Sequence, residues 1–280
     1  MSSILTNNSA MTALSTLRNI NNTLSDTQNK ISTGLKISSG KDNAAYFSIS
    51  KTMSGDSGMY KAIDENLTLQ MNAVSTARLG AETIVELAND FVERVAFAQG
   101  GTAEVRADVQ AELNELVARM NTTIAQSTFN GTDYVSNPST AISVVTGISR
   151  TGTSVTTTSL TFNSQDLSDI ATQLGSISLL TAAADTAAEQ TLALQNAEGQ
   201  LSAAIASATA LGIAEKSIET QKDFLSELSD RLDSGVGAMI DADMEEEAAR
   251  LQALQVQQQL ATQSLSIANS SPQNILSLFQ

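Results

Sequence analysis

The chain has 280 residues, a formal net charge of −15 at pH 7, and neither cysteine nor histidine. These absences exclude a disulfide, a thiolate nucleophile, a zinc site of cysteine or histidine, and a serine–histidine–aspartate relay. The carboxylate excess disfavours nucleic acid and anionic lipid, which need surfaces rich in lysine and arginine. We therefore expect no cofactor, no bound metal, no nucleic-acid partner and no membrane partner. An enzyme is the weakest option, because only carboxylates and lysines are left for catalysis.

The N-terminal segment Met1–Ser15 lacks the basic and apolar regions of a secretory signal peptide. No run of about 18 apolar residues occurs elsewhere, so we expect no membrane-spanning helix. Taken alone, these two observations favour a cytoplasmic protein.

The first predicted helix carries a coiled-coil seam, in which seam residues recur in alternating steps of four and three. Its members are Ala10, Leu14, Leu17, Asn21, Leu24, Gln28, Ile31 and Leu35. Ser38-Ser39-Gly40 interrupts this pattern. We expect an irregular stretch from Lys41, Asp42 and Asn43 to Gly58.

Two further helices follow with the same spacing. The second runs from Ile63 to Ala98 and ends at a Gly100-Gly101 cap. Thr102 is suited to cap the third, because a threonine hydroxyl accepts a hydrogen bond from the first turn of a helix. The third helix continues to Ile124 and stops before the turn signal Phe129-Asn130-Gly131.

A β-hairpin is predicted over residues 140–163. β-branched residues alternate from Ile142 to Ile148, Arg150–Thr153 resembles a turn, and Val155–Phe162 is rich in threonine. If this hairpin faces outward, its hydroxyls are candidate O-glycosylation sites, and an exposed threonine-rich hairpin without sugar is the alternative. The candidates are Thr151, Thr153, Ser154, Thr156, Thr157, Thr158 and Ser159.

Helical character returns in the last third of the chain. A short helix and loop are expected over Asp166–Leu180, and a long helix from about Asp185 to Leu232. Ser234–Gly237 loosens that pattern, and a final helix begins near Asp243. The acidic residues 241–247 lack the glycine and alternation of an EF-hand loop, so favourable charge at a helix start explains them better.

The tail Leu251–Gln280 contains no charged side chain. Ordering its backbone costs roughly 30–60 kcal/mol at 1–2 kcal/mol per residue. An isolated helix buries too little apolar surface to offset this, so we expect the tail to order when it packs on the first helix and on other copies. An ordinary bundle within one chain is the alternative. The predicted assembly interface is Leu14, Leu17, Leu24, Ile31, Leu35, Leu251, Leu254, Leu260, Leu265 and Ile267.

Two long segments resemble the terminal signatures of bacterial flagellins, in particular the alphaproteobacterial branch. They are STGLKISSGKDNAAYFSIS over Ser32–Ser50 and DADMEEEAARLQALQVQQQLATQSLSIANSSPQNILSLF over Asp241–Phe279. The resemblance implies a mainly α fold of long antiparallel coiled-coil helices. Residues 1–42 and 236–280 would pair as an inner-tube domain, and residues 43–235 would form a rod-like helical core domain with the hairpin.

The resemblance also implies a function. Copies of the chain would polymerise into a hollow helical filament that serves as a propeller, after type III export without a cleavable signal peptide. The protein would then be extracellular, with itself, an export chaperone, and cap and hook-associated proteins as partners. Lys41, Asp42 and Asn43 would form the joint that sets the angle between the domains. The alternatives are a hook–filament junction protein and a secreted helical effector or translocator.

Overall fold

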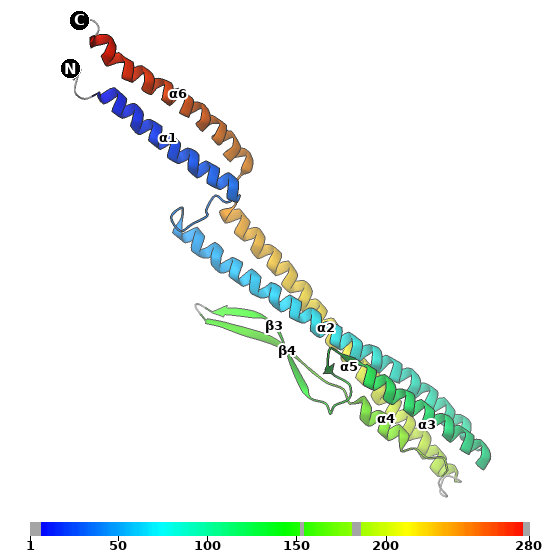
Figure 1. Cartoon of the computed structure of the whole chain (residues 1–280). Coiled ribbons are helices and arrows are strands. Elements are labelled where there is room, and N and C mark those ends of the chain that lie inside the picture. Colours follow the sequence, from blue (N-terminus) through cyan, green and yellow to red (C-terminus); the bar gives the residue numbers. More distant parts are fainter. Residues whose placement is uncertain (1–6, 152–153, 181–185, 277–280) are drawn as a thin grey trace. The chain divides into compact units, whose positions relative to one another are not determined.

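A computed structural model describes residues 7–151, 154–180 and 186–276, and side chains as far as residue 270. The fold is mainly α with a small antiparallel hairpin, which confirms the predicted class (Figure 1). In chain order the elements are α1 (Asn8–Thr33), α2 (Ala44–Ala98), α3 (Ala103–Gln126), β1 (Thr128–Phe129), β2 (Thr132–Asp133), β3 (Ala141–Thr151), β4 (Ser154–Asn163), α4 (Leu167–Gly175), α5 (Ala187–Ile240) and α6 (Met244–Leu276).

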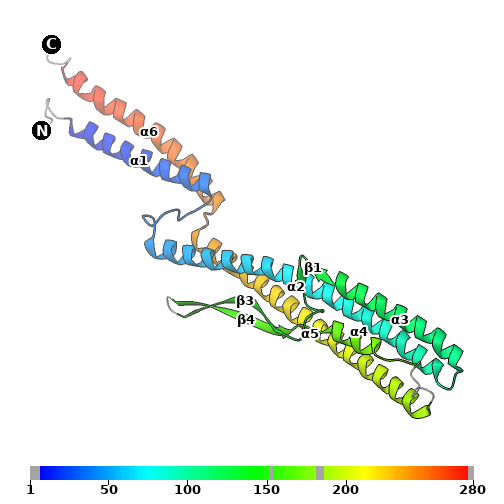
Figure 2. The ribbon, with the colours of Figure 1, turned by 60° about the horizontal axis from the view of Figure 1, so that its bottom comes forward.

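The chain divides into two compact units. Unit 1 comprises residues 1–57 and 230–280, and unit 2 comprises residues 58–229. In unit 1, α1 and α6 lie side by side and antiparallel (Figures 1 and 2). In unit 2, α2, α3, α4 and α5 enclose the main hydrophobic core.

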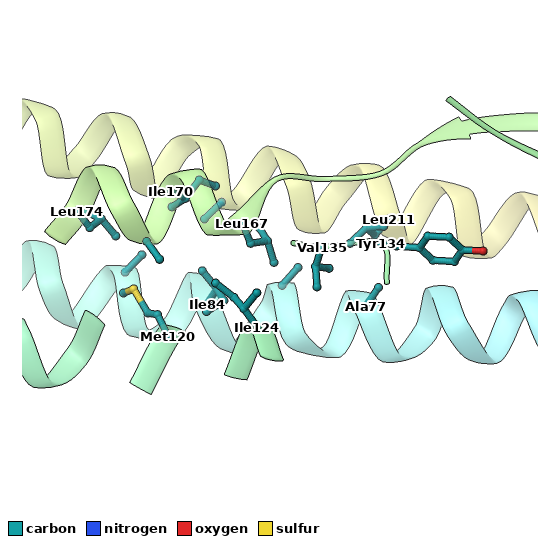
Figure 3. Close-up of a cluster of buried hydrophobic side chains, with 14 of the residues drawn as sticks. Ala77, Ile84, Met120, Ile124, Tyr134, Val135, Leu167, Ile170, Leu174 and Leu211 are labelled. Atoms are coloured by element: carbon teal, nitrogen blue, oxygen red, sulfur yellow. The ribbon is translucent and has the colours of Figure 1, made fainter. Parts of the chain in front are cut away.

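The core of unit 2 follows the predicted stripes closely. Ala77 and Ile84 of α2 meet side chains of α3, α4 and α5, as Figure 3 shows. Long stretches of each helix keep one face apolar, so every turn adds a buried contact. The predicted stripe members that are fully or nearly fully buried include Leu67, Val74, Ala81, Phe91, Val95, Leu113, Met120, Leu211, Ile218 and Leu225.

The β3–β4 hairpin is the predicted one, with a register running from Ala141 opposite Asn163 to Thr151 opposite Ser154. It lies along α2 and α5 (Figure 2). The Tyr60 hydroxyl of α2 donates to the Ile148 carbonyl at 3.2 Å, and Gln221 Nε2 of α5 donates to the Thr146 carbonyl at 3.0 Å. The hairpin is therefore held to the helices through carbonyls of β3.

Three local predictions are confirmed. Thr102 caps α3 by accepting from the Val105 amide. The short helix expected after Asp166 is α4, and the Asp166 side chain caps it by accepting from the Asp169 amide. The turn between β1 and β2 places Asn130 at a φ of 49° and Gly131 at 78°. Positive φ is the conformation for which an Asn-Gly pair is suited.

Two boundaries differ from the expectation. α2 begins at Ala44, so the expected irregular stretch ends at Asn43 instead of Gly58. The Asn43 side chain accepts hydrogen bonds from the Ala45 and Tyr46 amides, which starts the helix early. α5 also continues through the expected loosening at Ser234–Gly237 and ends at Ile240.

Candidate assembly interface

The inner stripe of α6 is the row of side chains that faces α1. Its members recur in steps of four and three, as in a coiled coil, and all of them are buried or half-buried. They are Glu247, Leu251, Leu254, Gln258, Ala261, Leu265 and Ala268. The predicted interface residues Leu251, Leu254 and Leu265 thus lie on the face of α6 that packs on α1, a pairing that both the assembly interpretation and its alternative require.

The face of α1 that meets α6 differs in part from the predicted seam. Ala10, Leu17, Leu24, Ile31 and Leu35 are half-buried as expected, but Leu14, Asn21 and Gln28 are exposed. Ala13, Ile20 and Thr27 take the places predicted for Leu14, Asn21 and Gln28. Ala13 and Leu14 are both apolar, so spacing alone does not decide which of two adjacent residues faces the partner helix.

Three polar contacts link α1 to α6 at separate levels. Asn7 Nδ2 donates to the Ala268 carbonyl at 2.8 Å. Gln258 Nε2 donates to Asn21 Oδ1 at 2.7 Å. Lys30 Nζ lies 3.4 Å from Glu247 Oε1. Polar groups at a helix interface favour the register that pairs them, so these contacts favour a single alignment of α1 with α6. Sequence patterning did not identify these pairs, because helical spacing shows which side chains share a face but not which polar atoms of two helices reach each other.

Glu247 is the charged residue of the inner stripe. It is only 6% exposed, although Glu245 and Glu246 beside it are exposed. Lys30 and Arg250, whose Nη1 is 3.8 Å away, both approach its Oε1, whereas Oε2 has no hydrogen-bond partner among the described residues. A buried carboxylate is tolerated where cations pair with it, so this contact depends on Lys30.

The outer stripe of α6 is a second row, which faces away from α1. Every member is exposed, and the same steps of four and three relate them. They are Ala249, Ala253, Val256, Leu260, Gln263 and Ile267. Val256 is 55% exposed, Leu260 65% and Ile267 61%. Two predicted interface residues, Leu260 and Ile267, therefore remain uncovered by α1.

The outer stripe is a surface suited to helix–helix packing. Burying each of its larger side chains would contribute about 1.5–3 kcal/mol relative to leaving it in water. No charged side chain follows Arg250 in the sequence, so no ion has to be desolvated along this row. Met11 and Leu14 of α1 add further exposed apolar surface in unit 1, at 64% and 38% exposure.

The predicted joint lies between α1 and α2. Gly34 ends α1 in the left-handed conformation, with a φ of 71°. Its carbonyl accepts from the Ala242 amide at 2.9 Å, and the Ile240 carbonyl accepts from the Lys36 amide at 2.6 Å. Leu35, a predicted interface residue, forms a backbone bridge with Asp241. The two connecting segments of unit 1 are thus bonded directly to each other.

Asp42 closes the loop of this joint. Its Oδ2 accepts from the backbone amides of Ser38 and Ser39 at 3.0 and 2.9 Å, and from both hydroxyls at 3.2 Å. These hydrogen bonds, chiefly that from the Ser39 amide and next that from the Ser38 amide, lower the pKa of the Asp42 carboxyl. Lys41 beside it is exposed, and Asn43 caps α2. A hollow of about 900 Å³ lies next to the loop, with Lys36 and Tyr46 in its wall.

The candidate glycosylation residues run from the turn of the hairpin to the middle of β4, where Ser159 pairs with Val145 of β3. All of them that the structure describes are exposed, and Thr153 falls outside the described residues. The exposed ones are Thr151, Ser154, Thr156, Thr157, Thr158 and Ser159. Their accessibility is compatible with modification and equally with a bare hairpin.

Over residues 7–151, 154–180 and 186–276, no helix is long and apolar enough to cross a membrane. Within the same ranges, no group of three or more acidic side chains is placed to hold a metal ion.

The chain is similar to known proteins from end to end. The model of the bacterial flagellin N-terminal helical region matches residues 4–140, and that of the C-terminal helical region matches residues 194–279. A flagellin of Brucella melitensis is 41% identical, with both chains covered in full. Flagellin C of Rhizobium meliloti is 34% identical over the whole of both chains. Flagellin FljM of Caulobacter vibrioides is 32% identical, with all of this chain and 99% of the relative covered.

Proposed function

Because the chain belongs to the bacterial flagellins and is a structural subunit of the flagellar filament, we propose that the outer stripe of α6 joins neighbouring copies in that filament. The observation that carries this proposal is the exposed row of Val256, Leu260 and Ile267 on a helix whose other face is already paired. A helix with two apolar rows needs two partners to bury both. α1 supplies one partner, and another copy supplies the second.

We propose that residues 1–42 and 236–280 form the inner-tube domain of the filament, and that residues 43–235 form the surrounding core domain. The charge-free tail supports this assignment. Glutamine, serine and asparagine side chains satisfy buried hydrogen bonds across helices, and they also line a wet channel without creating a strong field. Leu14, Leu17, Leu24, Ile31 and Leu35 belong to the α1 side of this assembly interface.

Membership of the family also supports a proposal for the remaining partners and the location. We propose that the subunit is exported without a cleaved signal peptide, that it is extracellular, and that a chaperone, cap proteins and hook-associated proteins bind it. The lack of cysteine supports export in an unfolded state, because no disulfide can form prematurely. The lack of histidine and cysteine supports a structural role without catalysis.

We propose that Lys41, Asp42 and Asn43 set the angle at the joint. The four hydrogen bonds that Asp42 accepts support this role, because they give the loop one defined shape. We also propose the exposed hydroxyls from Thr151 to Ser159 as O-glycosylation sites. Mass spectrometry of filaments sheared from cells tests this, and unmodified peptides over that range would refute it.

The central proposal is tested by changing only the outer stripe. The variant Val256→Ser/Leu260→Ser/Ile267→Ser keeps the inner stripe, and Gln252→Ser/Gln255→Ser/Gln259→Ser is a matched control at exposed positions of the same helix. We expect the first to stay monomeric after salt-induced assembly and the control to form filaments, as seen by negative-stain electron microscopy. Circular dichroism of the soluble chain checks that both remain helical.

Deletion of Leu251–Gln280 is the coarser test, and it should abolish filaments altogether. Normal filaments from either the deletion or the outer-stripe variant would refute the proposal.

A further inference from the structure

The two longest helices contain seven glycines, and four of these form two close pairs. Gly55 and Gly58 belong to α2, and Gly235 and Gly237 belong to α5. A glycine in a helix interior is about 1 kcal/mol less favourable than alanine, because it loses more backbone entropy on folding. The pair in α2 therefore weakens that helix locally, and Gly235 does the same in α5, whereas Gly237 already lies in the last turn before Ile240.

No steric or backbone requirement explains Gly55 and Gly58. A Cβ atom built on either meets nothing within 4 Å, and neither has a positive φ. Gly80 of the same helix is different, since a Cβ there would lie 1.9 Å from the Ser127 hydroxyl oxygen. Added Cβ atoms at Gly235 and Gly237 would meet only the outer ends of the Met53 and Asp241 side chains, at 3.2 and 2.7 Å.

The two pairs of glycines lie at the same level of adjacent helices. Ser57 Oγ of α2 donates to Asp233 Oδ1 of α5 at 2.6 Å, between the two pairs. Gly235 also contacts Met53 across the helices. The weak turn of α2 therefore lies against the weak turn of α5, and we call these two stretches, residues 54–58 and 233–237, the glycine segment.

Packing at this level is also weak. The buried side chains of α2 here are Ser50 and Ser57, each 2% exposed. No hydrophobic residue is buried between residues 38 and 66 or between 226 and 253, both of which the structure describes throughout. Leu67 and Leu225, by contrast, are 0% and 1% exposed. Few buried apolar contacts are the physical condition for low local stability.

We propose that the glycine segment is a compliant element at which α2 and α5 bend together while both remain helical on either side. Its two stretches are aligned, so bending at one does not require the other helix to break elsewhere. This inference concerns the single chain and does not depend on how copies pack in the filament.

Hydrogen exchange of the soluble full-length chain tests local stability. We expect amides of residues 50–58 and 230–237 to exchange at least about tenfold faster than those of residues 70–78 and 211–218. Gly55→Ala/Gly58→Ala should slow exchange in the segment by about fivefold for each glycine replaced. Gly199→Ala is the matched control, because that helical glycine also faces open space, and it should leave the segment unchanged.

Distances between spin labels test bending itself, and the cysteine-free chain allows clean labelling. Ser48→Cys/Asn72→Cys spans the glycine segment, and Asn72→Cys/Ala96→Cys has the same spacing beyond it, at exposed positions of α2. Each pair spans about 36 Å of straight helix. We expect a broader distance distribution for the first pair, narrowed by Gly55→Ala/Gly58→Ala. Equal widths for the two pairs, or exchange in the segment as slow as in the flanking helix, would overturn the proposal.

Discussion

Gly80 of α2 lies directly against Ser127 at the end of α3, so closely that a Cβ atom on Gly80 would be 1.9 Å from the Ser127 hydroxyl oxygen and 2.6 Å from its Cβ. Ser127 is itself fixed, because its hydroxyl donates to the Thr123 carbonyl at 2.6 Å. The helices approach here at a distance that only glycine permits.

Gly80→Ala should therefore destabilise the chain by about 1–3 kcal/mol, the usual effect of overpacking a close contact. Gly199→Ala, the same substitution where a Cβ meets nothing within 4 Å, should be neutral or stabilise by up to about 1 kcal/mol. Urea unfolding followed by circular dichroism measures both. If both substitutions lowered the free energy of unfolding, or both raised it, the close contact between Gly80 and Ser127 would be contradicted.

The Lys30–Glu247 pair should respond differently to single and double replacement. Lys30→Met removes one of the two cations that pair with the buried Glu247 carboxylate, so it should lower the free energy of unfolding by about 1–3 kcal/mol. The lower end of that range is favoured because the lysine side chain is 30% exposed to solvent. Lys30→Met/Glu247→Leu removes both charges and should be close to neutral. A double-mutant cycle on thermal unfolding gives the coupling. Strictly additive effects would show that the two residues do not interact.

Tyr134 contributes a hydrogen bond and a ring contact that can be separated. Its hydroxyl donates to Gln70 Oε1 at 2.5 Å, and its ring meets Phe162 edge-on at 5.5 Å between centroids. Tyr134→Phe keeps the ring and should lower the free energy of unfolding by about 1 kcal/mol, the contribution of the hydrogen bond. Tyr134→Ala should lower it by about 3–5 kcal/mol, because this substitution also leaves a cavity. Equal losses in denaturant unfolding would mean that the ring contributes nothing.

Asp42 should titrate below its ordinary pKa of 3.8 in the folded chain. A carboxyl with a lowered folded pKa stabilises the folded state above the unfolded pKa, and that contribution is lost as pH falls through the folded pKa. The loop should thus keep its shape through neutral and mildly acidic pH and open only below 3.8.

Carboxyl carbon NMR measures this titration directly. Ser38→Ala/Ser39→Ala removes two hydroxyl donors but keeps both amides, so the pKa of Asp42 should rise only part of the way toward its ordinary value. An unchanged midpoint in this variant would show that the hydroxyls do not contribute.

Much of the fold could be predicted from the sequence, because long helices repeat one physical requirement many times. The stripe from Leu67 to Ala98 is buried as predicted, since many consecutive turns define one face. The start of α2 was predicted at the wrong residue because Gly55 and Gly58 suggested a loop, whereas the cap at Asn43 starts a helix that tolerates them. The glycines and the capping residue favour different starts for this helix, and the sequence alone does not show which of the two effects is larger.

The candidate interface was predictable as a region and less so in its details. The ends of the chain were correctly expected to carry seams, and the polar contact between Asn21 and Gln258 was missed. On α6, the predicted Leu254 turned inward and the predicted Leu260 outward. α6 carries two rows with heptad spacing, and either row could face α1 without changing the sequence pattern. Only the structure of the helix pair shows which row faces inward.

The outer stripe has a thermodynamic consequence that follows from its composition. Between Arg250 and the end of α6 no side chain is ionisable, so a contact made there takes up and releases no protons. It also displaces no counterions, and its strength should not fall as ionic strength rises. A dependence of polymerisation on pH, or a weakening of polymerisation as salt concentration rises, therefore reports on the charged remainder of the subunit, whereas strengthening by kosmotropic salts is expected of this apolar stripe.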